Sequence, residues 1–108
     1  MSTITPHADY ATLINVFTVQ PERARQLADL LTVATEEVMQ HIDGFVSANI
    51  HLSTDGTRVV NYAQWRNADA LQAMRSNPTA QEHMTRCADL ADRFEPHLYT
   101  VESVHSAP

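Results

Sequence analysis

Apolar residues follow two different patterns along this chain, and each pattern predicts one kind of element. The first apolar and β-branched run, at residues 13–19, stops before Pro21 and predicts a strand. Over residues 22–41, apolar side chains recur at three- and four-residue steps, and Gly44 follows as an expected helix end. The chain is therefore predicted to begin with a strand and an amphipathic helix of about five turns.

The middle of the chain predicts a β-hairpin. Two strand-like runs, Phe45–Leu52 and Arg58–Trp65, are separated by five polar or small residues. The Asp55-Gly56 pair in this connection tolerates the positive φ that a tight reversal needs. We expect the two runs to pair as neighbouring antiparallel strands.

The second half of the chain predicts two helices and a last strand. Asn67 can cap a short helix over residues 68–75, and Pro78 can start a longer one. The apolar stripe of the longer helix is predicted to consist of Ala80, Met84, Cys87, Ala91 and Phe94. Pro96 is expected to end that helix, and residues 97–104 are expected to form the last strand.

The predicted element order, β-α-β-β-α-β, is that of an α+β, ferredoxin-like fold with one antiparallel sheet and its helices on one face. Both faces of the first strand are substantially apolar, so neither face is expected to be freely solvated. In so small a chain, a second copy is the most economical cover for the other face. We therefore expect a homodimer with sheet against sheet, a dimeric α+β barrel.

The length of 108 residues predicts one domain, over residues 11–105, with a loose arm at 1–10 and a short tail at 106–108. Acidic residues outnumber basic ones by 13 to 7, which disfavours nucleic acid and anionic lipid as partners. The lone Cys87 fits a reducing compartment, and no secretion signal or membrane-spanning run is evident. The expected location is the cytoplasm.

Two asparagines stand out in strands that should be buried. Alternation places Asn61, Ala63 and Trp65 on one face of the third strand, and it places Asn15 beside Phe17 on the first. Asparagine is depleted in strands and costly to bury unpaired, so these residues indicate a ligand site. The structural alternative is that each asparagine bonds to backbone at a bulge and that Trp65 fills the core.

Two of the six histidines could move a proton near neutral pH. His51 ends the second strand, and His83 flanks the apolar stripe of the last helix. The alternative for His83 is a boundary position, half in water. The sequence has no spacing typical of a zinc site, a nucleotide-binding loop or a nucleophile elbow.

Several strings in the middle of the chain resemble the antibiotic biosynthesis monooxygenase family. These are the Gly44-Phe45 pair, HLSTDGT at 51–57 and VVNYAQW at 59–65, and the similarity is strongest to the branch that oxidises anthrones to quinones. The resemblance implies a small aromatic substrate, dioxygen as the oxidant and no cofactor. It also implies that Asn61 and Trp65 are the key residues.

The chain departs from that branch at two places. It has Leu71 where relatives carry a tyrosine on the short helix, and their helical arginine aligns nearer Met84 than Arg86. His83 or Arg86 could replace these groups in proton transfer. The predicted catalytic residues are therefore Asn61, Trp65, His51, His83 and Arg86, and the predicted substrate contacts are Asn15, Phe17, Ala63, Leu71 and Met84.

Two alternatives stay open at this point. The heme-degrading branch of the same superfamily uses a first-strand asparagine, the tryptophan and an iron-ligating histidine, and Asn15, Trp65 and His83 stand at matching positions. Heme would then be the cofactor. The other alternative is a dimer that binds aromatic ligands without catalysis.

Overall fold

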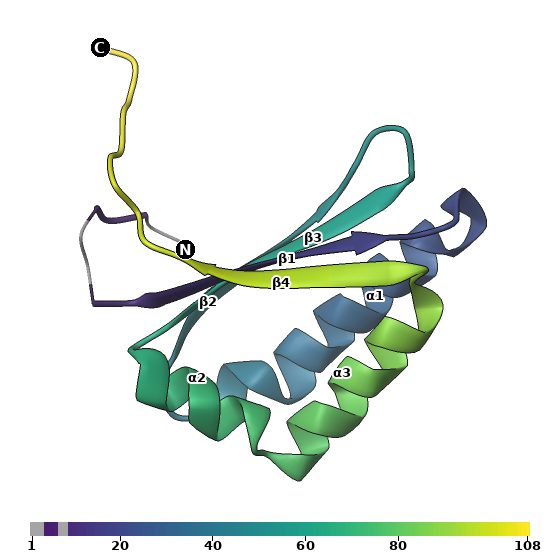
Figure 1. Cartoon of the computed structure of the whole chain (residues 1–108), viewed down its shortest axis with the longest axis horizontal. Coiled ribbons are helices and arrows are strands. Elements are labelled where there is room, and N and C mark those ends of the chain that lie inside the picture. The colour runs from purple at the N-terminus through teal and green to yellow at the C-terminus, as the bar shows by residue number, and fades with distance from the viewer. Residues whose placement is uncertain (1–3, 7–8) are drawn as a thin grey trace.

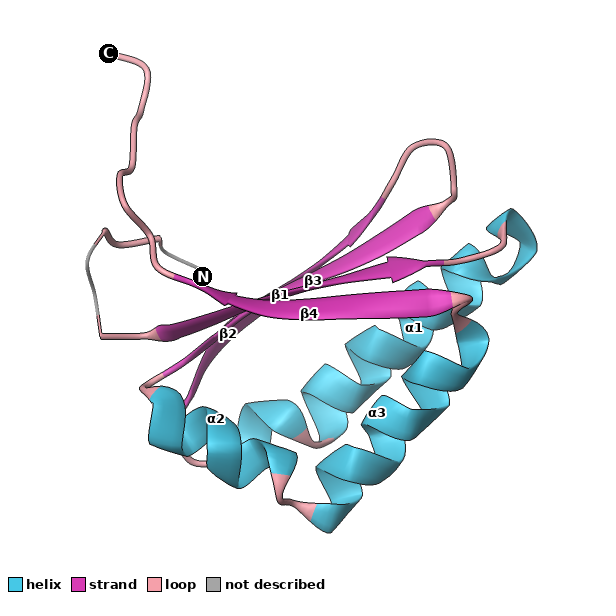
Figure 2. Ribbon diagram, in the orientation of Figure 1, coloured by secondary structure: helices cyan, strands magenta, loops and turns pink. Residues whose placement is uncertain are grey.

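The computed structural model describes residues 4–6 and 9–108, and within them a sheet of four antiparallel strands forms one layer of the fold (Figure 1). The strands are ordered β2-β3-β1-β4 and span Ala11–Thr18 (β1), Phe45–Leu52 (β2), Arg58–Trp65 (β3) and Arg93–Tyr99 (β4). The helices lie together on one face of the sheet (Figure 2) and span Pro21–Glu37 (α1), Ala68–Arg75 (α2) and Pro78–Leu90 (α3). This arrangement confirms the predicted ferredoxin-like α+β fold.

The predicted hairpin is confirmed, with β2 and β3 at their expected bounds. Its turn is held by the carboxylate of Asp55, which accepts hydrogen bonds from the Thr57 backbone N–H at 3.0 Å, the Thr57 hydroxyl at 2.7 Å and the Ser53 hydroxyl at 2.8 Å. These bonds, with those of Thr57 foremost, lower the pKa of Asp55 to about 2. Gly56 takes the positive φ, +74°, that the turn requires.

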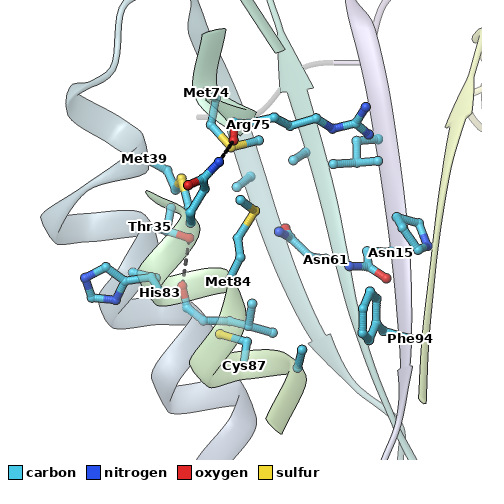
Figure 3. A pocket seen from close by; sticks show the side chains of 18 of the residues that line it. Asn15, Thr35, Met39, Asn61, Met74, Arg75, His83, Met84, Cys87 and Phe94 are labelled. Atoms are coloured by element: carbon cyan, nitrogen blue, oxygen red, sulfur yellow. Dashed lines mark hydrogen bonds between the residues drawn. The ribbon is translucent and has the colours of Figure 1, made fainter. Parts of the chain in front are cut away.

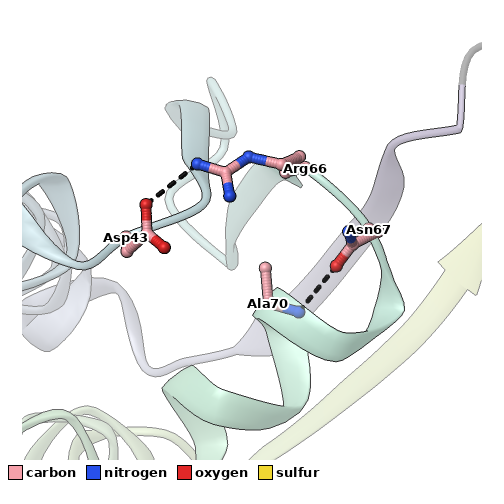
Figure 4. Close-up of polar contacts among 4 residues, drawn as sticks. All are labelled: Asp43, Arg66, Asn67 and Ala70. Carbon is pink, nitrogen blue, oxygen red and sulfur yellow. Dashed lines mark hydrogen bonds and ion pairs between the residues drawn. The ribbon is translucent and has the colours of Figure 1, made fainter.

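A tight corner joins α2 to the sheet (Figure 4). Gly44 has a φ of +90°, and a Cβ there would lie 2.5 Å from the Cβ of Ala70. Arg66 pairs with Asp43 at 2.9 Å, and this bond lowers the pKa of the Asp43 carboxyl. The Asn67 side chain caps α2 by accepting from the Ala70 N–H at 2.8 Å, as predicted.

Gly44 itself does not end a helix, contrary to the prediction. α1 ends at Glu37, and a short 3-10 turn at Met39–His41 follows it. Gly44 instead precedes β2, where the close approach of α2 leaves no room for a side chain. The apolar residues of this segment keep their three- and four-residue spacing as far as Val38. This spacing does not show where the α-helix ends and the 3-10 turn begins, so the helix was predicted too long.

The last strand also differs from the prediction. α3 ends at Leu90 rather than near Pro96, and β4 spans Arg93–Tyr99 rather than residues 97–104. The Asp92 N–H donates to the Thr18 carbonyl at 2.8 Å. Pairing with β1 therefore begins at the next residue, Arg93, soon after α3 ends. Pro96 is tolerated within β4 because this is an edge strand. Phe94 therefore belongs to β4 and not to the helix.

The helix side of the sheet holds two separate core clusters. One cluster includes Phe17, Leu27, Val59 and Cys87, and the other is built around Trp65, Leu71, Met74 and Ala80. The predicted N-terminal arm, residues 1–10, lies partly outside the described residues. Among the helices of the described residues, none has the length and apolar character needed to cross a membrane.

The other face of the sheet, which we call the open face, carries no helix among the described residues. At one end of it Gln64 is buried and bridges two strands, donating to the Thr12 hydroxyl at 3.2 Å and accepting from the Ser47 hydroxyl at 3.5 Å. Its centre is apolar and half-buried, with the cross-strand pairs Ile14–Tyr62 and Val16–Val60.

Candidate active site

A cavity of about 470 Å³ separates the sheet from the helices, and residues of both core clusters line it. The space exists because small side chains face one another across it. These are Ala34 on α1, Ala48 on β2, Ala63 on β3 and Ala88 on α3. A volume of this size falls in the range of pockets that hold small organic ligands.

Asn15 and Asn61 lie side by side in this cavity (Figure 3). They are direct partners in the antiparallel register of β1 and β3, and both side chains point to the helix side of the sheet. The Oδ1 atom of each is buried and has no hydrogen-bond partner among the described residues. Because an unsatisfied buried carbonyl costs about 1–3 kcal/mol, the pair is arranged for a ligand rather than for stability.

Aromatic rings bound the cavity at two places. Trp65 is 2% exposed and meets Phe45 edge to face, with ring centroids 5.4 Å apart. Phe17 and Phe94 are in tilted contact at 6.1 Å. Aromatic walls with a few polar groups suit a flat aromatic ligand.

Few titratable groups reach the cavity. Its lining within the described residues includes Arg75, His83 and Cys87, and it includes no aspartate or glutamate. Burial raises the pKa of the Cys87 thiol to about 11, so this group stays protonated at neutral pH. The Nδ1 atom of His83 is buried without a partner among the described residues, and Figure 3 shows the ring on the α1 side of α3, away from the asparagines.

The cavity opens beside the edge strand β4. Phe94 lines the cavity and is nevertheless 48% exposed, and Pro96 lines it from the same strand. Arg75, at the end of α2, is also an exposed lining residue. These three exposed lining residues lie where the cavity reaches the surface of the protein, and we refer to this part of it as the cavity mouth.

Most of the residues predicted from the sequence lie together in the cavity. The lining includes the predicted residues Asn15, Phe17, Asn61, Ala63, Trp65, His83 and Met84. The strand residues among them converge because the odd-numbered positions of β1 and β3 share the face that the helices cover, whereas His83 and Met84 reach the cavity from α3.

Three predicted residues lie elsewhere. His51 is exposed on the open face, where it pairs in register with Val60. Arg86 points away from the cavity and forms an ion pair with Glu82 at 2.7 Å on the exposed side of α3. Leu71 is 2% exposed and belongs to the core cluster around Trp65, so it supports the cavity wall without lining it.

Several lining residues were not predicted from the sequence, and the polar ones among them are Thr35, Arg75, Gln81 and Thr85. The Gln81 amide donates to the Arg75 carbonyl at 2.8 Å and so joins the end of α2 to α3. The Thr35 hydroxyl donates to the Leu31 carbonyl at 2.8 Å, within α1. Sequence patterns gave no sign of these residues because the packing angle of the helices decides which of their positions meet the sheet.

The fold and the cavity define a ferredoxin-like α+β protein with a ligand site between its sheet and helices. Residues 11–86 match the family described as antibiotic biosynthesis monooxygenase. A relative at 48% identity over 91 residues, 84% of this chain and 81% of its own length, is the tetracenomycin-F1 monooxygenase of Streptomyces glaucescens. The chain belongs to the antibiotic biosynthesis monooxygenase family.

Two solved structures extend the comparison. The ActVA-Orf6 monooxygenase of Streptomyces coelicolor, solved with the ligand nanaomycin D, is 26% identical with a TM-score of 0.79, covering 94% of each chain. A variant of SnoaB, a cofactor-independent oxygenase of Streptomyces nogalater, is 25% identical with a TM-score of 0.72, covering 90% of this chain and 97% of its own.

Proposed function

We propose that this protein is a cofactor-independent monooxygenase that oxidises an anthrone or a related phenolic polyketide to a quinone with dioxygen. The observation that carries the proposal is the pair of unsatisfied asparagine oxygens in an aromatic-walled cavity. Relatives described as a tetracenomycin monooxygenase and a cofactor-independent oxygenase support the reaction class.

The reaction is balanced without a cofactor. The anthrone loses a proton from its reactive CH₂ carbon to give an electron-rich enolate, which transfers one electron to dioxygen. The resulting radicals combine into a peroxide at that carbon, and protonation gives the hydroperoxide. Loss of water leaves a carbonyl, so that anthrone and O₂ yield quinone and H₂O. The protein has to stabilise the enolate and exclude bulk water.

The asparagine pair provides that stabilisation. The amide N–H groups of Asn61 and Asn15 donate to the enolate oxygen, and their free Oδ1 atoms accept from hydroxyl groups on the substrate. Removal of one such donor typically lowers the rate by about 10²–10³. Trp65 and Phe45 hold the ring plane of the substrate.

His83 is the proposed proton acceptor, and because its ring lies on the α1 side of α3, away from the asparagines (Figure 3), it receives the proton through a water rather than directly from the substrate. Of the titratable groups among the described lining residues, Arg75 is a permanent cation and Cys87 is held protonated. An imidazole can accept a proton near neutral pH, and the Nδ1 atom of His83 has no competing partner among the described residues. A His83→Gln variant should lower kcat while still binding ligand, as measured by turnover and by ligand titration.

The heme-degrading alternative has less support. It requires His83 to face a planar ligand beside the asparagines, whereas the ring lies on the α1 side of α3 (Figure 3). The relative at 48% identity is a tetracenomycin monooxygenase. We therefore propose no cofactor.

A homodimer is part of the proposal. The apolar pairs Ile14–Tyr62 and Val16–Val60 occupy the centre of the open face, and helices do not cover them in the described part of the chain. Face-to-face packing of two sheets would bury these pairs in both copies at once. We also propose a cytoplasmic location, in keeping with a single unpaired cysteine.

Isotope labelling tests the reaction. Chelator-treated protein is supplied with a hydroxyanthrone under ¹⁸O₂, and the quinone is analysed by mass spectrometry after correction for autoxidation. The proposal predicts enzyme-dependent formation of quinone with one ¹⁸O atom, and one quinone for each O₂ consumed. Binding of the anthrone without faster product formation would instead indicate the non-catalytic alternative.

A further inference from the structure

Arg75 occupies a position at the cavity mouth that the proposed chemistry does not use. It lies in the last turn of α2, is exposed and lines the cavity. Figure 3 shows its side chain extending from α2 toward the strands of the sheet. The bond from the Gln81 amide to the Arg75 carbonyl, at 2.8 Å, fixes the backbone from which it extends.

Arg75 is the arginine among the described residues that line the cavity. The chain has a formal net charge of −6, yet no aspartate or glutamate is among the described residues that line the cavity. Arg66 and Arg86 are each bonded to a carboxylate, whereas Arg75, like Arg23 and Arg58, has no ion pair among the described residues. An acidic protein thus presents an unpaired guanidinium beside a cavity whose described lining holds no carboxylate.

We propose that Arg75 binds a carboxylate at the end of the polycyclic substrate that stays at the mouth, and so sets which ring reaches the asparagines. This inference rests on the proposed function and adds a substrate class, aromatic acids. A guanidinium fork binds a carboxylate through two parallel hydrogen bonds, which fix direction as well as position. The apolar inner part of the cavity accepts the uncharged rings.

A purely structural role for Arg75 is the competing explanation, because a cation in the last turn of a helix stabilises the helix dipole. That role would affect every ligand equally. Recognition of a carboxylate would affect only ligands that carry one. Two ligands that differ only in this group therefore separate the explanations.

The binding experiment compares anthraquinone-2-carboxylate with anthraquinone-2-carboxamide. Trp65, the only tryptophan of the chain, lines the cavity, so quenching of its fluorescence reports binding. We expect Arg75→Gln to weaken binding of the carboxylate about tenfold, the effect of losing a partly exposed charge-assisted bond, and to change carboxamide binding less than twofold. Arg75→Lys should restore part of the carboxylate affinity.

Arg23→Gln is the matched control, because Arg23 is exposed in the first turn of α1 and does not line the cavity. It should leave both affinities unchanged. Equal weakening of both ligands in Arg75→Gln, or no weakening of either, would overturn the inference. So would failure of the wild-type protein to prefer the carboxylate.

Measurements of turnover distinguish a failure of the proposed role of Arg75 from a failure of the proposed function. Wild-type protein and Arg75→Gln are assayed on a hydroxyanthrone and on its carboxylate derivative. We expect the ratio of kcat/KM for the acid to kcat/KM for the neutral compound to fall about tenfold in the variant. If wild-type protein oxidises neither compound, the proposed function fails. If it oxidises both and the ratio does not change, only the role of Arg75 fails.

Discussion

Asn15 and Asn61 are direct partners across β1 and β3, and each has a buried side-chain oxygen that no described residue satisfies. The next strand places Pro96 opposite Asn15, so the asparagine pair is flanked by a residue that has no backbone N–H. The two side-chain oxygens lie without a described partner at the point where the central strands of the sheet face the cavity.

The first prediction concerns stability. Asn61→Ala and Asn15→Ala should leave the free energy of unfolding unchanged or raise it by about 1 kcal/mol, because each removes an unsatisfied buried carbonyl. Urea denaturation measures this. Gln64→Ala is the control, since the Gln64 amide is buried and bonded on both sides, and it should lower stability by about 1–3 kcal/mol. Equal losses in all three variants would argue that the asparagines are structural.

The corner at Gly44 gives the second prediction. Gly44→Ala should lower the free energy of unfolding by about 1–3 kcal/mol, because it combines a strained positive φ with a contact against Ala70. Adding Ala70→Gly should recover the contact part of the loss but not the backbone part. Gly56→Ala, which has the same sign of φ but only ordinary contacts at 3.6 Å, should cost less than Gly44→Ala. A larger loss at Gly56 would contradict this explanation.

The Cys87 thiol provides a pH-dependent prediction. Its pKa is raised from 9.0 to about 11 by burial, so the unfolded chain ionises first as pH rises. The contribution of the neutral thiol is complete below pH 9 and is lost as pH rises toward 11. The stability difference between wild-type protein and Cys87→Ala should therefore shrink over this interval, as measured by chemical denaturation. A difference that stays constant with pH would show that the thiol is not shielded.

The open face gives a prediction about assembly. Val16→Glu should convert the dimer into a monomer, because it places a charge among the apolar pairs at the centre of the proposed interface. Light scattering coupled to gel filtration measures the mass. Val33→Glu, the same change at an exposed position on α1, should remain dimeric. A monomeric wild-type protein at micromolar concentration would overturn the dimer proposal.

Local patterns were sufficient to predict the parts of the fold that local chemistry decides. The Asp55-Gly56 turn was sufficient to predict the bounds of β2 and β3, and the Asn67 cap was sufficient to predict the start of α2. The end of α3 was not predictable in this way, because the bond from the Asp92 N–H to the Thr18 carbonyl joins residues far apart in sequence. The three- and four-residue spacing continues through Ala91 to Phe94, so it extended the predicted helix past Leu90, and only the pairing with β1 places Phe94 in a strand.

The candidate site was predictable to the extent that alternation along strands determines it. Asn15, Asn61 and Trp65 follow from the two-residue period of β1 and β3. Positions on helices were less certain, since the rotation of α2 and α3 about their axes decides whether Leu71, Arg75 or Arg86 meets the cavity. Only the packed structure shows that Arg75 lies at the mouth.

The most direct measurement is dioxygen uptake on a hydroxyanthrone by chelator-treated wild-type protein and by Asn61→Ala, both corrected for autoxidation. We expect catalysed uptake by the wild-type protein and a loss of about 10²–10³ in kcat for the variant, with its fold retained. Uptake by Asn61→Ala at the wild-type rate would contradict the assignment of the asparagine pair as the catalytic centre.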